Sequence, residues 1–94
     1  MKTKLISKNI TINGRRTSLR LEQASWEAMN DICQCEGLTL HELCSLIETH
    51  RQGASRTLAV RAFIITYFRT VVAEYGVLQK GTTSMFLPEL GARR

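Results

Sequence analysis

Two arginines and one serine alternate along a short stretch near the N-terminus, which runs Arg16-Thr17-Ser18-Leu19-Arg20-Leu21. Successive side chains of a β-strand point to opposite faces, so Arg16, Ser18 and Arg20 share one face and the residues that alternate with them share the other. A guanidinium group is a planar fork of hydrogen-bond donors, and a hydroxyl can donate or accept. The stretch therefore predicts a strand with one face for burial and one cationic face for groups that accept hydrogen bonds.

The cysteines and histidines are the other side chains that could bind or react. Cys33, Cys35 and Cys44 cannot all form disulfides with one another, and all fall in segments with helical periodicity. Residues two positions apart on a helix point about 200° apart, so Cys33 and Cys35 cannot readily hold one metal ion. We interpret the cysteines as reduced, packed thiols and His41 and His50 as polar residues on helix surfaces. No nucleophile–base motif supports catalysis, so we expect no metal, no cofactor and no enzymatic activity.

The excess positive charge of the chain lies in its first quarter. Residues 1–22 contain six lysines and arginines and one glutamate, whereas residues 23–94 contain seven cations and seven anions. A basic segment joined to a neutral body suits a polyanion, and nucleic acid is favoured over an acidic membrane surface. We expect the charges of Lys2, Lys4 and Lys8 to meet phosphates.

No segment predicts export or a membrane span. Residues 1–12 include basic side chains but no continuous apolar core. The most apolar stretch, Leu58 to Val72, is interrupted by Arg61 and Arg69 and is too short to cross a bilayer. Together with the reduced thiols, these features favour a cytoplasmic, nucleoid-associated protein without membrane contact.

Three helices are predicted after the strand. Apolar residues recur at helical spacing over about 23–36, from 39 to about 50, and over 55–75. Gly37 supplies the stop of the first helix, and Thr39 with Glu42 forms a T-x-x-E capping box at the start of the second. The third helix is apolar around much of its girth, which exceeds what one small core can cover. Part of it is therefore expected to face a partner chain.

These elements divide the chain into four parts. They are a basic N-terminal arm (1–15), a core of one strand and two helices (16–51), a third helix (55–75) and a tail (77–94). The tail contains turn-forming residues and has no clear period. It is therefore not assigned to the packed core.

The pair Asn13-Gly14 leaves the N-terminal arm open to two interpretations, because it is a favoured two-residue hairpin turn. A hairpin would pair Ile10 with Thr17 and Thr11 with Arg16. It would also compete with, or widen, any ribbon formed between subunits. We favour a mobile or loosely docked basic arm over a stable hairpin.

A single strand followed by helices has no pairing partner in its own chain. Unpaired backbone groups make such a strand unstable, and even a two-stranded ribbon needs helices behind it. The economical solution is a homodimer in which residues 16–21 of two chains pair antiparallel over the first two helices. Such a ribbon fits the major groove of DNA, where arginine recognises guanine with two hydrogen bonds.

The order of these features resembles the ribbon-helix-helix superfamily. The residues that carry the resemblance are the stretch Arg16 to Glu22, then Trp26, then Gly37-Leu38-Thr39-Leu40, then Leu43 and Ile47. The resemblance covers roughly Ile10 to Tyr75 and is closest to a bacterial branch with a third helix after the core. It implies a mainly α fold in which one β-strand per chain pairs antiparallel across a homodimer.

The resemblance also implies which residues touch DNA. Arc-type members use three alternate strand residues for base contacts, which correspond here to Arg16, Ser18 and Arg20, and Arg15 lies beside them. They clamp a phosphate with backbone N–H groups at the start of the second helix, which correspond here to Leu40 and His41 after Thr39. Free N–H groups and the helix dipole explain why a helix N-terminus binds an anion.

Three functions follow from these expectations. The leading one is sequence-specific binding of double-stranded DNA by a homodimer, with higher oligomers on DNA, as a transcriptional repressor. The alternative is an antitoxin or another protein-interaction module whose segment 77–94 folds on a partner protein. The third is a homodimeric structural domain that has lost DNA binding.

Overall fold

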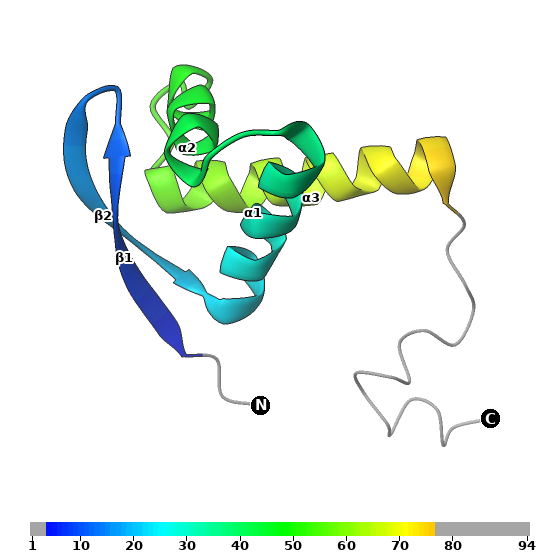
Figure 1. Cartoon of the computed structure of the whole chain (residues 1–94), viewed down its shortest axis with the longest axis horizontal. Coiled ribbons are helices and arrows are strands. Elements are labelled where there is room, and N and C mark those ends of the chain that lie inside the picture. Colours follow the sequence, from blue (N-terminus) through cyan, green and yellow to red (C-terminus); the bar gives the residue numbers. More distant parts are fainter. Residues whose placement is uncertain (1–3, 77–94) are drawn as a thin grey trace.

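The computed structural model describes residues 4–76, which form a hairpin followed by three helices (Figure 1). The elements are β1 (Leu5–Ile12), β2 (Arg15–Glu22), α1 (Gln23–Glu36), α2 (Leu40–Thr49) and α3 (Arg56–Tyr75). The predicted mainly α class with a third helix is confirmed. None of the helices in the described range is long and apolar enough to cross a membrane.

β1 and β2 pair antiparallel within the chain, so the chain contributes two strands rather than the single strand expected. The turn between them has positive φ at both Asn13 (50°) and Gly14 (81°), as a two-residue hairpin turn of the Asn-Gly type requires. Ile10 lies opposite Thr17 and Thr11 opposite Arg16, which is the register that a hairpin was expected to have. The loosely docked arm that we favoured from the sequence is therefore wrong for residues 5–12.

The hairpin buries one of its two faces. On β2, Leu19 and Leu21 are 3% and 0% exposed, and on β1 Ile10 and Ile12 are also buried. Beneath this face lies one core, to which the helices contribute Trp26, Met29, Ile32 and Cys33 from α1, Leu43, Cys44 and Ile47 from α2, and Val60 from α3. The hairpin and the first two helices thus share a single apolar interior.

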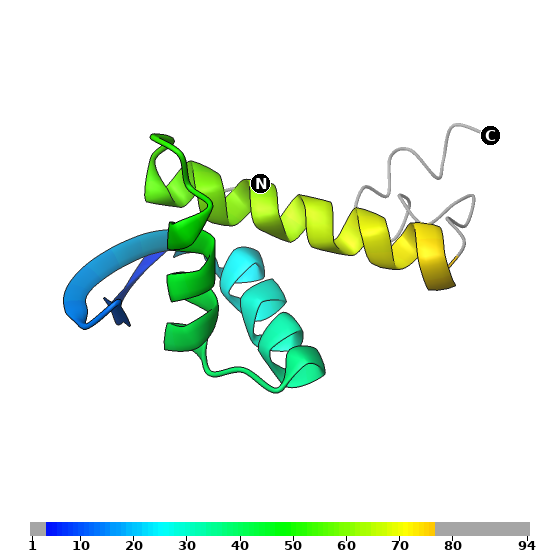
Figure 2. The ribbon, with the colours of Figure 1, turned by 90° about the horizontal axis from the view of Figure 1, so that it is seen from above.

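α3 packs against α1, α2 and β2, and its C-terminal half projects beyond them (Figures 1 and 2). Val60 is its one fully buried residue, whereas Leu58 and Ile65 are both 60% exposed. The prediction that α3 carries more apolar surface than its own chain can cover is consistent with this exposure.

The helix ends follow the expected local chemistry. Gly37 ends α1 in the left-handed region, at φ 67°. Thr39 and Glu42 form the predicted capping box of α2, and the Ser55 hydroxyl accepts a hydrogen bond from the Leu58 amide at the start of α3. These caps place all three helices within a residue or two of their predicted bounds.

The cysteines divide into two kinds. Cys33 and Cys44 are buried, and burial raises the pKa of both thiols, that of Cys44 to about 11. Cys35 is exposed, so the expectation that all three thiols are packed is wrong for Cys35. Residues two apart on a helix face different ways, which is why only one of Cys33 and Cys35 reaches the core.

Candidate nucleic-acid interface

The outward face of the hairpin consists of three cross-strand pairs of polar side chains. Opposite Arg20, Ser18 and Arg16 of β2 lie Ser7, Asn9 and Thr11 of β1. All are exposed apart from Thr11, which is half-buried. The structure therefore brings Arg16, Ser18 and Arg20 onto one open face, as the alternation of the sequence predicts.

The outer edge of β1 is covered by α2 at its turn end. The Thr11 amide donates to His41 Nδ1 at 2.9 Å, and the Asn13 amide donates to Ser45 Oγ at 3.1 Å. In an antiparallel pair, the backbone N–H and C=O groups of one residue point to the partner strand, and those of the next residue point away from it. The two residues of a cross-strand pair behave alike. Because the Thr11 amide points away from β2, the opposing Arg16 amide points away from β1.

The same alternation places the amides of Ser18 and Arg20 on the outer edge of β2. β1 is the neighbour of β2 on its other side, and no further strand lies beside β2 within residues 4–76. The two edges of the hairpin therefore differ: α2 accepts hydrogen bonds at the edge of β1, whereas the outward amides of β2 have neither a hydrogen-bond partner nor a neighbouring strand among residues 4–76.

The start of α2 lies beside the turn end of this face, since His41 contacts the strand residue that pairs with Arg16. The capping box uses the Thr39 amide, which donates to Glu42 Oε1 at 2.8 Å, and the Glu42 amide, which donates to the Thr39 hydroxyl at 3.1 Å. The amides of Leu40 and His41 have no hydrogen-bond partner in the described part of the chain. They are thus free to donate to an anion, as the expected clamp requires.

The charge at the end of the face is balanced within the chain. Glu22, the last residue of β2, accepts hydrogen bonds from Arg61 of α3, with Nε 3.2 Å from Oε1. These bonds hold the pKa of Glu22 below its usual value. Arg15, Arg16 and Arg20 form no salt bridge among residues 4–76. Their charges are available to an external anion.

Lys8 does not belong to the outward face. It lies opposite Leu19, and its ammonium group is 5.1 Å from the centroid of the Trp26 ring. A cation at this distance is attracted to the face of the indole. The expectation that Lys8 points to phosphates together with Lys2 and Lys4 is not supported for Lys8, while Lys2 lies outside the described residues.

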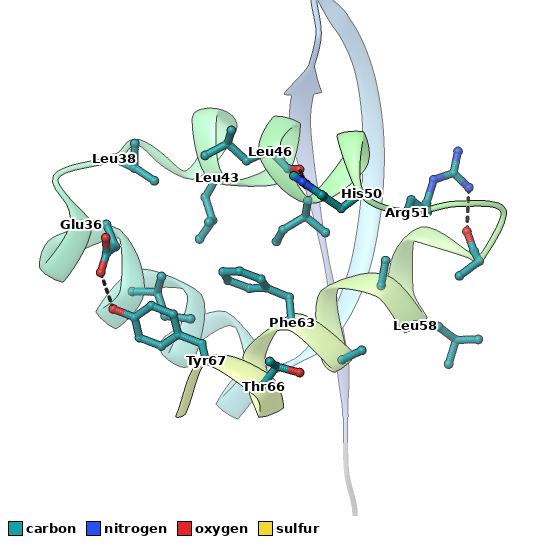
Figure 3. Close-up of a pocket in the computed structure, with 15 residues that line it drawn as sticks. Glu36, Leu38, Leu43, Leu46, His50, Arg51, Leu58, Phe63, Thr66 and Tyr67 are labelled. Atoms are coloured by element: carbon teal, nitrogen blue, oxygen red, sulfur yellow. Dashed lines mark hydrogen bonds between the residues drawn. The ribbon is translucent and has the colours of Figure 1, made fainter. Parts of the chain in front are cut away.

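A groove on the helical part of the molecule separates α2 from α3 (Figure 3). It has a volume of about 770 Å³, and Leu43 and Phe63 point into it. The Tyr67 hydroxyl donates to Glu36 at 2.6 Å near one end. Apolar side chains dominate the lining, so the groove suits a protein surface better than a nucleic acid.

Sequence reasoning missed the contribution of β1 to the outward face. Ser7, Asn9 and Thr11 lie there because β1 begins at Leu5, well before Ile10, the first residue that the hairpin alternative paired. The Asn13-Gly14 turn was the signal that could have found them. The expected role of the tail, residues 77–94, lies outside the described residues.

One comparison with known proteins gives a match. A family model described as "Ribbon-helix-helix domain" matches residues 5–68, which reach from the start of β1 to Phe68 in α3. No curated protein and no solved structure matches the chain.

Proposed function

The chain belongs to the ribbon-helix-helix domain family, and on this premise we propose that it is a homodimeric transcriptional repressor that binds double-stranded DNA sequence-specifically. The family suggests a regulator of the DNA-binding type. Repression, the operator and the dimer are the parts of this proposal that go beyond the family.

The observation that carries the proposal is the outward face of β2. Arg16, Ser18 and Arg20 are exposed side by side on a strand whose other face is sealed in the core. Arginine offers a bidentate fork to guanine O6 and N7, and a serine hydroxyl serves several bases. The buried side chains of Leu19 and Leu21 hold β2 against the core. The backbone that carries the three outward side chains is therefore held in place.

The two edges of the hairpin support a dimer in which β2 pairs with β2 of a second chain. The edge of β1 is contacted by α2 at Thr11 and Asn13, whereas the edge of β2 has backbone groups available. Pairing β2 with itself gives a four-stranded sheet with β2 strands in the centre and β1 strands outside. The central pair is then the intersubunit ribbon that enters the major groove.

The apolar surface of the helices also supports a second copy of this chain as the partner. The lining of the groove between α2 and α3 includes the exposed apolar side chains of Leu46 and Leu58. A chain this small buries a modest fraction of its apolar surface alone, and association with a copy of itself is a common remedy. A dimer that covers this surface removes it from water.

Proline substitutions test the arrangement of the dimer. Ser18→Pro removes an amide from the open edge of β2 without removing a bond of the hairpin, and should lower dimer affinity and operator binding. Ser7→Pro is the matched control for dimer affinity, because it removes an amide from the outer edge of β1, where no second chain pairs in this arrangement. Light scattering gives the oligomeric state and circular dichroism the fold. Equal dimer affinity in both variants would overturn pairing through β2.

A gel-shift titration over several salt concentrations tests DNA binding itself. We expect the protein to bind the region upstream of its own gene more tightly than a shuffled duplex, with affinity that falls as salt rises. Footprinting then defines the operator. Equal affinity for both duplexes would refute sequence-specific binding, and no affinity for either would refute the proposed function as a whole.

A further inference from the structure

The outward face of β1 is a row of neutral hydrogen-bonding side chains that the proposed base contacts do not use. Ser7 and Asn9 are exposed, and each stands directly opposite a residue of β2 that faces DNA in the proposed function. Side chains of such directly opposite pairs lie about 4.5–5.5 Å apart. Whatever binds over Ser18 therefore also passes close to Asn9.

The position of β1 is fixed by three contacts from the helices. The Trp26 indole donates to the Ile6 carbonyl at 2.9 Å, and α2 accepts hydrogen bonds from the Thr11 and Asn13 amides. The row that contains Ser7 and Asn9 lies between these anchors. It is held at a constant distance from β2 without any strand on its outer side in the described residues.

The dimensions of the dimeric sheet place β1 beside the DNA backbone rather than over the bases. Neighbouring strands lie about 4.8 Å apart, so the two outer strands of a four-stranded sheet are about 14 Å apart. The major groove is about 12 Å wide. The central β2 strands enter the groove, and each β1 strand lies over one of its rims.

We propose that Ser7, Asn9 and Thr11 form a neutral phosphate-binding row on each side of the ribbon, which positions the dimer on duplex DNA without reading its sequence. This inference rests on the proposed function and adds a ligand class, the backbone phosphates at the groove rims. Hydroxyl and amide groups are ordinary donors to phosphate. The amides of Ser7 and Asn9 point to the outer edge of β1 and add to the same site.

Asn9 and Asn30 provide a matched pair of test positions. Both are exposed asparagines, but Asn9 lies in the row and Asn30 lies on α1. We expect Asn9→Ala to raise the Kd for the operator and for a shuffled duplex by the same factor, roughly tenfold for two lost contacts per dimer. The dependence of Kd on salt concentration should stay as in the wild type, because the side chain that is lost is neutral. Asn30→Ala should change neither Kd.

Lysine substitutions at the same two positions test whether phosphates lie near β1, because a new cation there should gain a phosphate contact. Asn9→Lys should increase the affinity of the protein for both duplexes. It should also steepen the slope of log Kd against log salt concentration by about 2 per dimer, since each new phosphate contact releases counterions. Asn30→Lys should change the slope far less. Thermal unfolding checks that all four variants keep the wild-type fold.

Each result decides for or against the phosphate row. If Asn9→Ala weakens the operator alone, Asn9 reads a base and the inference is overturned. If the slopes of Asn9→Lys and Asn30→Lys agree, no phosphate lies near β1 and the inference is also overturned. Both outcomes leave the proposed function intact when the wild-type protein still prefers its operator. A wild-type protein that binds no duplex would instead refute the proposed function and this inference together.

Discussion

The two faces of β2 are one residue apart in sequence and differ in burial and in polarity. Leu19 and Leu21 are almost fully buried, whereas Ser18 and Arg20 next to them are exposed. The inward row stabilises the fold, and the outward row is available for a ligand. The comparison teaches that a strand can keep the side chains that stabilise the fold apart from those that a ligand can reach, because a shift of one residue exchanges its faces.

Leu21→Ala gives the largest expected effect and defines the inward face. The side chain is 0% exposed, so its truncation should lower the free energy of unfolding by about 2–5 kcal/mol. Chemical denaturation monitored by circular dichroism measures the change. A loss under about 1 kcal/mol would mean that the core beneath β2 is loosely packed, and the contrast between the faces would fail.

Arg16→Ala and Arg20→Ala define the outward face. Each removes a proposed bidentate base contact, so each should cost about 1–3 kcal/mol of discrimination between the operator and a random duplex. The free energy of unfolding should change little, because neither arginine is buried or salt-bridged among residues 4–76. Competition gel shifts measure the discrimination. If operator preference survives in folded dimers of both variants, β2 is not the recognition element.

Thr39→Ala tests the start of α2, where the observed helix cap lies beside the expected phosphate clamp. Loss of the cap should lower the free energy of unfolding by about 1 kcal/mol, since the Glu42 amide loses its acceptor. Operator preference should be kept, because the Leu40 and His41 amides carry no sequence information. Thr39→Ser should restore the stability. A change in base preference would show that the start of α2 recognises sequence.

Arg61→Gln gives the smallest expected effect and concerns the end of β2. Arg61 lowers the pKa of Glu22, so the contact stabilises the fold above the ordinary pKa of glutamate and is lost as the pH falls through the lowered value. The variant should therefore show a shallower loss of stability between about pH 5 and pH 3 than the wild type. Thermal melts across this range provide the measurement. Identical pH profiles would mean that this half-buried ion pair contributes nothing to stability.

Local patterns were sufficient to predict the helices and the faces of β2. The Thr39–Glu42 capping box, the Gly37 stop and the alternation around Leu19 each depend on residues a few positions apart. The outward placement of Arg16, Ser18 and Arg20 followed from the same short period. These are the parts of the candidate site that the sequence predicts well.

The pairing of β1 could not be predicted with the same certainty, because its anchors are remote in sequence. The Trp26 indole is 20 residues from Ile6, and His41 is 30 residues from Thr11. The basic composition of the N-terminal segment favoured a solvated arm. It gave no indication that Lys8 would lie over an indole ring or that Asn9 would stand beside Ser18.

The open edge of β2 has a consequence for the newly synthesised chain. A strand edge with unused amides and carbonyls can pair with any suitable strand, so a chain that leaves this edge unpaired is exposed to aggregation. The arginines of β2 oppose such pairing, because the positive charges of two β2 strands that approach edge to edge repel each other. Duplex DNA bound as we propose would neutralise that repulsion, so nucleic acid should promote association of the chain with itself. The same charges would thus protect the free chain from misassembly and favour assembly on DNA.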